Sequence, residues 1–185
     1  MIDDVLKDAA RRMDKSVEAT RHEFTTIRTG RASAALLERI NVSAYGTKMP
    51  INQLATISVP EPRLLTITPF DKGVMRDIEK AIMESDLGLT PNNDGQLIRL
   101  PIPQLTEERR KELVKVVRHM AEEGRVAVRN VRRDVMHHLK ELVDKGEAGK
   151  DDEHRAEERV QKLTDEHTQK IDELLKRKEA EILEV

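Results

Sequence analysis

The chain has 185 residues, of which 37% are charged and 37% are hydrophobic, and its formal net charge is −2. The absence of cysteine excludes disulfides, thiolate metal ligands and cysteine nucleophiles, and no apolar run approaches the length of a membrane span. With no tryptophan, one tyrosine and two phenylalanines, the core must be aliphatic. We therefore expect a cytoplasmic protein without a membrane segment, with one domain or two small ones, dominated by long helices.

Residues 2–28 are predicted to form the first helix, because their apolar side chains recur at helical spacing. Gly30 would end this helix, since glycine reaches positive φ at little cost. The apolar positions are Ile2, Leu6, Ala9, Met13, Val17, Phe24 and Ile27.

Residues 31–104 differ from both ends of the chain, because all seven prolines and four of the eight glycines lie there. Short alternating runs predict strands at 40–45, 55–59, 64–68 and 97–102, with a short helix at 74–84 and a loop at 91–95. We interpret this region as a small α/β module inserted between two helices. The chain would cross to it near Gly30–Arg31 and near Pro103–Leu105.

Two further helices are predicted, at 106–144 and 151–183, separated by a turn at Gly146 and Gly149. Thr106 is a suitable N-cap. Gly124 lies on the apolar face of the second helix, where close approach of another helix would explain it. The three amphipathic helices predict a bundle formed by residues 1–30 and 105–185.

The sequence RVAVRNVRRD carries four arginines, which we call the arginine stripe: Arg125, Arg129, Arg132 and Arg133. At about 100° per residue, a helix places all four on one side, in an arc centred roughly 140° from its apolar face. Arginine has a planar fork of donors that suits phosphate oxygens. The stripe therefore predicts either a phosphate-binding surface or an ordinary solvated charged face.

Charge is uneven along the chain. Residues 106–145 carry eleven Lys/Arg against eight Asp/Glu, a net of +3, whereas residues 146–185 carry eight against thirteen, a net of −5. A local basic stripe on an acidic protein indicates a defined docking face rather than indiscriminate nucleic-acid binding.

Catalytic chemistry has little support in the sequence. There is no phosphate-binding glycine loop and no nucleophile motif, and the adjacent His137 and His138 point to different helix faces. His167 lies on the apolar stripe of the last helix, where we expect a buried histidine with satisfied partners. We predict no catalytic residue, no metal site and no cofactor.

The segments IRTGRAS (27–33) and LTEERRK (105–111) resemble the hinge region of the bacterial ribosome recycling factor family. The resemblance continues through RVAVRNVRRD (125–134), SDLGL (85–89) and Ile98-Arg99, and it covers essentially the whole chain. It implies an α+β fold in which a long three-helix bundle carries an inserted β/α/β domain, in an L shape.

The resemblance also implies a function. Members of this family bind the large ribosomal subunit after termination and, with the GTPase elongation factor G, split the ribosome for reuse. The implied contacts to ribosomal RNA are Arg28, Arg31, Arg129, Arg132 and Arg133, with Arg125 beside them. The implied hinge is Gly30, Arg31, Pro103, Gln104 and Leu105.

Two other classes of function stay open at this point. A coiled-coil adaptor would use the same helices to dimerise, whereas we expect a monomer. A hydrolase would need clustered acids or bases in the insert, and the sequence indicates none.

Overall fold

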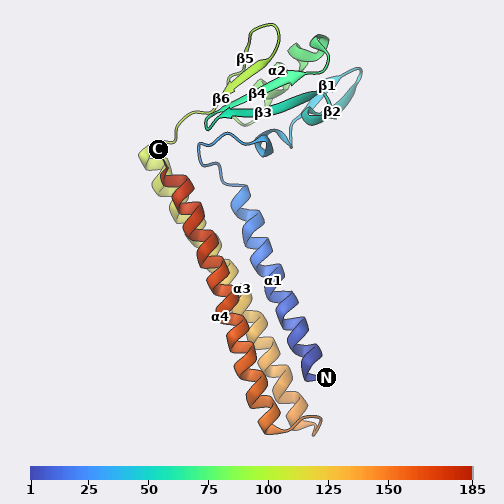
Figure 1. Cartoon of the computed structure of the whole chain (residues 1–185), viewed down its shortest axis with the longest axis vertical. Helices are drawn as coiled ribbons and strands as arrows, with labels where there is room; N and C mark the ends of the chain where they lie inside the picture. Colours follow the sequence, from blue (N-terminus) through green and yellow to red (C-terminus); the bar gives the residue numbers. More distant parts are fainter. Residues whose placement is uncertain (185) are drawn as a thin grey trace. The chain divides into compact units, whose positions relative to one another are not determined.

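The computed structural model describes residues 1–184, which divide into two compact units (Figure 1). One unit comprises Met1–Arg28 and Thr106–Val185, and the other comprises Thr29–Leu105. Long helices form the first unit, and strands with a short helix form the second. The predicted α+β class, a three-helix bundle with a small inserted sheet domain, is confirmed.

The helical unit is built from α1 (Ile2–Thr25), α3 (Glu107–Asp144) and α4 (Lys150–Leu183). Each helix contacts both others, and Figure 1 shows α3 and α4 side by side, joined by a short turn. Their shared interior is almost wholly aliphatic, as expected. The buried hydrophobic side chains larger than alanine are Leu6, Met13, Val17 and Phe24 of α1, Leu113, Val117, Val128, Val131, Val135, Leu139 and Leu142 of α3, and Val160, Ile171 and Ile182 of α4.

The end of α1 was predicted wrongly, because the helix stops at Thr25 rather than at residue 28. Thr25 Oγ1 donates to the carbonyl of His22 and Thr26 Oγ1 to that of Glu23, both at 2.6 Å. These hydroxyls compete with helical N–H groups for the last carbonyls. Gly30 does adopt a positive φ of 79°, but it lies beyond the helix and does not terminate it.

Gly124 marks the point where all three helices converge, which confirms the predicted close approach. A Cβ added to it would overlap Thr20 Oγ1 of α1 and would lie 3.2 Å from Ile171 Cδ1 of α4. Thr20 cannot easily rotate away, because its hydroxyl is buried and donates to the Ser16 carbonyl at 3.0 Å. Glycine is therefore needed here for space rather than for backbone conformation.

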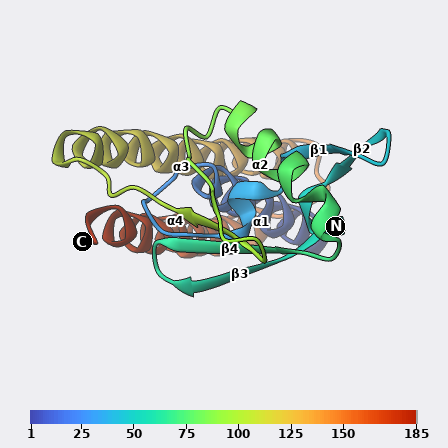
Figure 2. The same ribbon diagram turned by 90° about the horizontal axis from the view of Figure 1, so that it is seen from above.

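The inserted unit contains two antiparallel sheets and the helix α2 (Met75–Glu84). Strands β1 (Asn41–Ala44) and β2 (Thr47–Pro50) form a hairpin. The larger sheet has the order β3-β4-β6-β5, from β3 (Ala55–Glu61), β4 (Leu64–Pro69), β5 (Asn92–Asn93) and β6 (Ile98–Pro101). Figure 2 shows β3 beside β4, as their register requires. Alternate residues Leu65, Ile67, Ile98 and Leu100 share one core with Ile78 and Ile82 of α2.

Strands β2 and β5 were not predicted from the sequence. The residues TKMP of β2 have no apolar alternation, and their pairing depends instead on the tight turn at Tyr45 and Gly46, where φ is 53° and 75°. Strand β5 lies inside the segment predicted as a loop, where Asn92 pairs with Arg99 and Asn93 with Ile98. Pairing with a neighbouring strand across a turn, and not an apolar pattern of their own, defines both strands.

Asp94 fixes the turn between β5 and β6. Its carboxylate accepts hydrogen bonds from the backbone N–H groups of Leu97 and Gln96, at 3.0 and 2.9 Å, and from Arg99 Nη1 at 2.8 Å. These bonds favour the ionised form and lower the pKa of Asp94 to about 2.

The first prediction concerns Gly124. The substitution Gly124→Ala should destabilise the bundle by roughly 1–3 kcal/mol, because overpacking against Thr20 outweighs the roughly 1 kcal/mol gained in helix propensity. Chemical denaturation would measure this free energy of unfolding. Thr20→Ala removes the overlapping hydroxyl, so the double variant should recover part of the loss. Additive effects of the two substitutions would contradict the proposed contact.

The second prediction concerns acid stability. A carboxylate whose pKa is lowered by folding stabilises the native state above its unfolded pKa, and this contribution disappears as pH falls through the folded pKa. For Asp94 the window runs from about pH 4 down to about 2. Asp94→Asn should therefore flatten the loss of stability in that window relative to the wild type. Equal slopes for the wild type and the variant in acid titrations of unfolding would refute the assignment.

Candidate phosphate-binding surface

The arginine stripe lies on α3 beside its buried face, and not opposite to it. Arg125, Arg129 and Arg132 each follow a buried residue directly, so each is rotated about 100° from the core. They therefore border α4 along one edge of the bundle. Arg133 is rotated one further step and is exposed.

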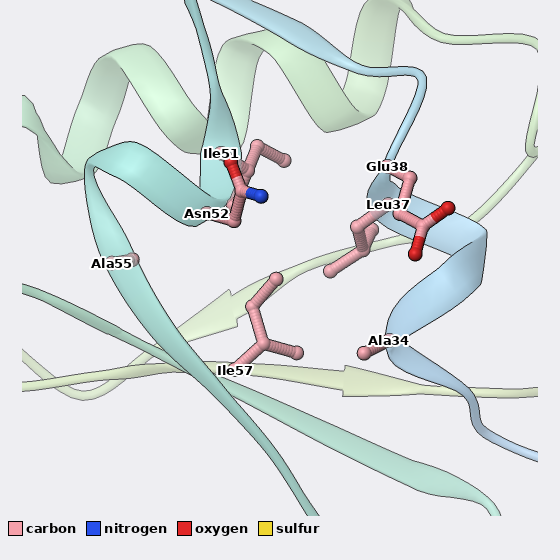
Figure 3. Close-up of a pocket in the computed structure, with 7 residues that line it drawn as sticks. All are labelled: Ala34, Leu37, Glu38, Ile51, Asn52, Ala55 and Ile57. Atoms are coloured by element: carbon pink, nitrogen blue, oxygen red, sulfur yellow. The ribbon is translucent and has the colours of Figure 1, made fainter.

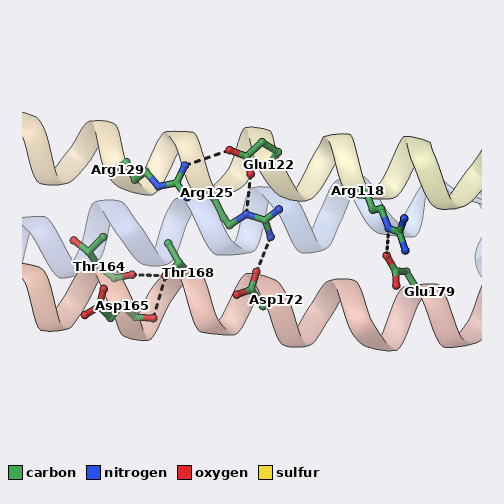
Figure 4. Close-up of polar contacts among 9 residues, drawn as sticks. All are labelled: Arg118, Glu122, Arg125, Arg129, Thr164, Asp165, Thr168, Asp172 and Glu179. Carbon is green, nitrogen blue, oxygen red and sulfur yellow. Dashed lines mark hydrogen bonds and ion pairs between the residues drawn. The ribbon is translucent and has the colours of Figure 1, made fainter.

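Two arginines of α3 cross to carboxylates of α4 (Figure 4). Arg118 Nε donates to Glu179 Oε1 at 2.7 Å, and Arg125 Nη1 donates to Asp172 Oδ1 at 2.6 Å. These partners were not predicted, because the sequence shows that the last helix is acidic but not which of its carboxylates face α3.

Arg125 is the least exposed arginine of these pairs, with 19% of its side chain accessible. Its Nε also donates to Glu122 Oε2 at 3.0 Å, so two carboxylates hold one guanidinium. Burial lowers the pKa of Arg125, but the hydrogen bonds with Glu122 and Asp172 outweigh burial and raise it. Hydrogen bonds from Arg125 and Arg129 lower the pKa of Glu122 in turn. Arg125 is therefore charged, neutralised locally and fixed between two helices.

The remaining arginines of the stripe are progressively freer. Arg129 Nη1 shares Glu122 through a contact of 3.2 Å to Oε1 and keeps 43% of its side chain exposed. Arg132 Nη1 donates to the neutral amide oxygen of Gln161 at 3.2 Å. Within residues 1–184, Arg133 makes no ion pair or side-chain hydrogen bond. Uncompensated positive charge is thus concentrated at Arg132 and Arg133.

The two other arginines predicted to bind RNA lie outside α3. Arg28 is exposed just beyond the end of α1 in the helical unit, and Arg31 is exposed in the inserted unit. Both take part in interactions within the protein. The structure therefore groups four of the six predicted residues on one helix and leaves these two on separate segments.

The predicted hinge residues all fall in the inserted unit, whose ends are Thr29 and Leu105. The two chain crossings touch there, because a Cβ added to Gly30 would lie 3.5 Å from Leu105 Cγ and 3.8 Å from the Pro103 carbonyl. Gln104 is tied to the insert as well, since its amide oxygen can accept from the Arg63 guanidinium.

His167 confirms the expectation of a buried, satisfied histidine. It is 3% exposed, and its Nδ1 and Nε2 lie 2.6 Å from the Leu163 carbonyl and 2.7 Å from Asp14 Oδ1. The contact with Asp14 joins α4 to α1, so this side chain has a structural position.

A cavity of about 270 Å³ opens in the inserted unit (Figure 3). Its lining is mainly aliphatic, with Glu38 and Asn52 as the polar members, and its other residues are Ala34, Leu37, Ile51, Ala55 and Ile57. The described residues contain no cluster of metal-ligating side chains. None of the helices in the described part is both long and apolar enough to cross a membrane.

Comparison with known proteins gives one consistent result. The family model described as "Ribosome recycling factor" matches residues 20–183. The chain is 63% identical over 180 residues to the ribosome-recycling factor of Rubrobacter xylanophilus, covering 97% of each protein. It is 57% identical to that of Carboxydothermus hydrogenoformans, over 100% of both chains.

Solved structures agree with the sequence relatives. A solution structure of the ribosome recycling factor matches 100% of this chain and 98% of its own, with a TM-score of 0.77 and 46% identity. A second match, with a TM-score of 0.65, 45% identity and 99% coverage of both chains, comes from models of the T. thermophilus ribosome recycling factor and the E. coli elongation factor G bound to the E. coli post-termination complex.

The third prediction compares Arg125, which is held by two carboxylates, with the exposed Arg133 of the same stripe. Arg125→Ala should lower the free energy of unfolding by about 1–2 kcal/mol, because a half-buried guanidinium and its packed stem are lost. Arg133→Ala should change it by less than about 0.5 kcal/mol, as expected at an exposed position. Urea titrations of both variants test this difference. If the two variants unfold alike, Arg125 does not fasten α3 to α4.

Proposed function

Because the chain belongs to the ribosome recycling factor family, we propose that it binds the large ribosomal subunit after termination and, with elongation factor G, dissociates the post-termination ribosome. Subunits, messenger and tRNA would then serve a new round of translation. The protein would act in the cytoplasm as a monomer and would not be an enzyme. Hydrolysis of GTP would take place on the partner, since this sequence contains no phosphate-binding glycine loop.

One observation on the residues themselves carries the proposal: among the described residues, the number of carboxylates paired with each arginine falls along the stripe, from two at Arg125 to one at Arg129 and none at Arg132. Within the arginine stripe, Arg132 and Arg133 are best placed to donate to phosphate oxygens, because no carboxylate of residues 1–184 pairs with them, whereas Arg125 and Arg129 are paired. Arg129 would contribute after releasing its share of Glu122. Folded RNA offers closely spaced phosphates, which guanidinium forks can bridge.

We assign a different role to Arg125. Because two carboxylates hold Arg125, a phosphate would have to displace both of them to bind its guanidinium. We therefore propose that Arg125 lies beside the RNA contact. By joining α3 to α4 it would hold in place the part of α3 that carries Arg129 and Arg132. Arg28 and Arg31 would extend the contact toward the segment that joins the two units.

In the proposed mechanism, the inserted unit would move while the bundle stays anchored. We propose that bending occurs around Gly30, Arg31, Pro103, Gln104 and Leu105. Two features support this assignment. The paired crossings are short, and Pro103 keeps Ile102 extended, so a change of angle would be concentrated at a few backbone positions.

The coiled-coil adaptor is less well supported. Its dimer would need the apolar faces of the long helices, but α1, α3 and α4 bury those faces against one another within a single chain. The hydrolase hypothesis would have to use the cavity of the insert, whose lining provides one carboxylate and one amide.

The fourth prediction tests the anchor. Arg132→Ala should weaken binding to purified large ribosomal subunits by about 1–3 kcal/mol, or roughly 5- to 150-fold, as for a lost charge-assisted bond to phosphate. The slope of log K against log salt should also become less steep, because fewer counterions are released. Filter binding over a range of salt concentrations measures both quantities.

The matched control is Arg155→Ala, which removes an exposed arginine of α4 that pairs with Asp152 of its own helix. It should leave affinity and salt slope unchanged. Subunit splitting by elongation factor G and GTP should fall with affinity in the Arg132 variant. Wild-type affinity in the double variant Arg129→Ala, Arg132→Ala would overturn the proposed anchor.

A further inference from the structure

Arginines of α3 and carboxylates of α4 form a regular ladder across the bundle edge (Figure 4). The first two rungs are Arg118 with Glu179 and Arg125 with Asp172. Moving from 118 to 125 on α3 corresponds to moving from 179 to 172 on α4, as expected for antiparallel helices with a heptad spacing. The same step places Arg132 opposite Asp165, so the register predicts a third ion pair.

The third rung is built differently, because Gln161 intervenes. Arg132 Nη1 donates to Gln161 Oε1 at 3.2 Å, and Gln161 Nε2 donates to Asp165 Oδ1 at 2.9 Å. An amide can do this because it offers an acceptor to the guanidinium and a donor to the carboxylate at the same time. With the amide turned over, its N–H groups would face the guanidinium of Arg132 and its oxygen would face the carboxylate of Asp165, so neither hydrogen bond could form. Asp165 is thereby held by an uncharged partner and makes no ion pair with Arg132.

This arrangement has an electrostatic consequence. Arg118 and Arg125 each face a carboxylate, so their charge is compensated within the protein. Arg132 is held against α4 by one neutral hydrogen bond, which restricts its position while leaving its charge and its other N–H groups available. A guanidinium that is positioned but not neutralised is well suited to an incoming phosphate, because no internal anion must be displaced.

We propose that Gln161 is a positioning residue for phosphate binding: it orients Arg132 and keeps Asp165 from closing the third rung of the ladder. This inference rests on the proposed binding of ribosomal RNA by Arg132. It assigns to α4, an acidic helix, a direct influence on the strength of an RNA contact made by α3.

Gln161→Glu is the decisive variant, because it keeps the shape of the side chain and places a carboxylate against Arg132. We expect roughly 5- to 50-fold weaker binding to large ribosomal subunits and a less steep salt slope, in the range expected for losing one charge-assisted contact, with a melting temperature equal to or above that of the wild type. The matched control is Gln169→Glu. It makes the same change of net charge at an exposed site about 12 Å along the helix, beyond the Debye length of about 8 Å, and should bind normally.

A second pair of variants tests the role of Asp165 without adding charge. Gln161→Ala should weaken binding, because Asp165 becomes free to pair with Arg132. Adding Asp165→Asn should restore most of the affinity, since no carboxylate is then left to close the rung. Rescue of this kind is not expected if Gln161 only supports the fold.

The outcomes also separate this inference from the proposed function. If Arg132→Ala weakens subunit binding but Gln161→Glu and Gln161→Ala bind like the wild type, the role of Gln161 is overturned and the anchor stands. If Arg132→Ala itself binds normally, the proposed anchor fails instead. If Gln161→Glu and Gln169→Glu weaken binding equally, net charge accounts for the effect and the positioning role is refuted.

Discussion

Close approach of three aliphatic helices is the constraint on which the bundle depends. A core with almost no aromatic side chains can be dry only if the helices come near enough for valine, leucine and isoleucine to interlock. At Gly124 the approach is so close that Thr20 and Ile171 occupy the space of a side chain. Residues that flank the buried positions of one helix therefore lie beside a neighbouring helix. Arg125, Arg129 and Arg132 are such residues, and they lie along the edge between α3 and α4.

The position of the stripe decides its electrostatics. Arginines that border a neighbouring helix can reach its carboxylates, and Arg118 and Arg125 do so, which adds links between α3 and α4 at the expense of free charge. At Arg132 an amide replaces the carboxylate, and Arg133, one residue further along the helix, is exposed. One helix therefore combines a clamped segment that holds the surface in shape with a charged segment that can meet phosphate. The two roles are distinguishable by experiment because they affect stability and binding separately.

The inserted unit follows a different physical principle. Its strands are short, and several are defined by turns and by pairing with a neighbouring strand rather than by an apolar pattern of their own, as in the hairpin at Tyr45 and Gly46. Its core is nevertheless separate and aliphatic, with α2 packed against alternate residues of β4 and β6. An independent core allows such a unit to move as a body, which is what the proposed recycling mechanism demands of it.

The sequence by itself determined the number of long helices, their apolar faces, the need for glycine at position 124, the buried histidine at 167 and the family resemblance, because each depends on local periodicity or on a contiguous motif. It did not determine the end of α1, the strands β2 and β5, or the partners of the arginines. Those depend on threonine hydroxyls competing for carbonyls, on strand pairing, and on which α4 residue faces which α3 residue. A helical pattern shows which face of a helix is charged, but the axial register between two antiparallel helices is set only when their side chains interlock. That register pairs Arg125 with Asp172 and leaves Arg132 to Gln161.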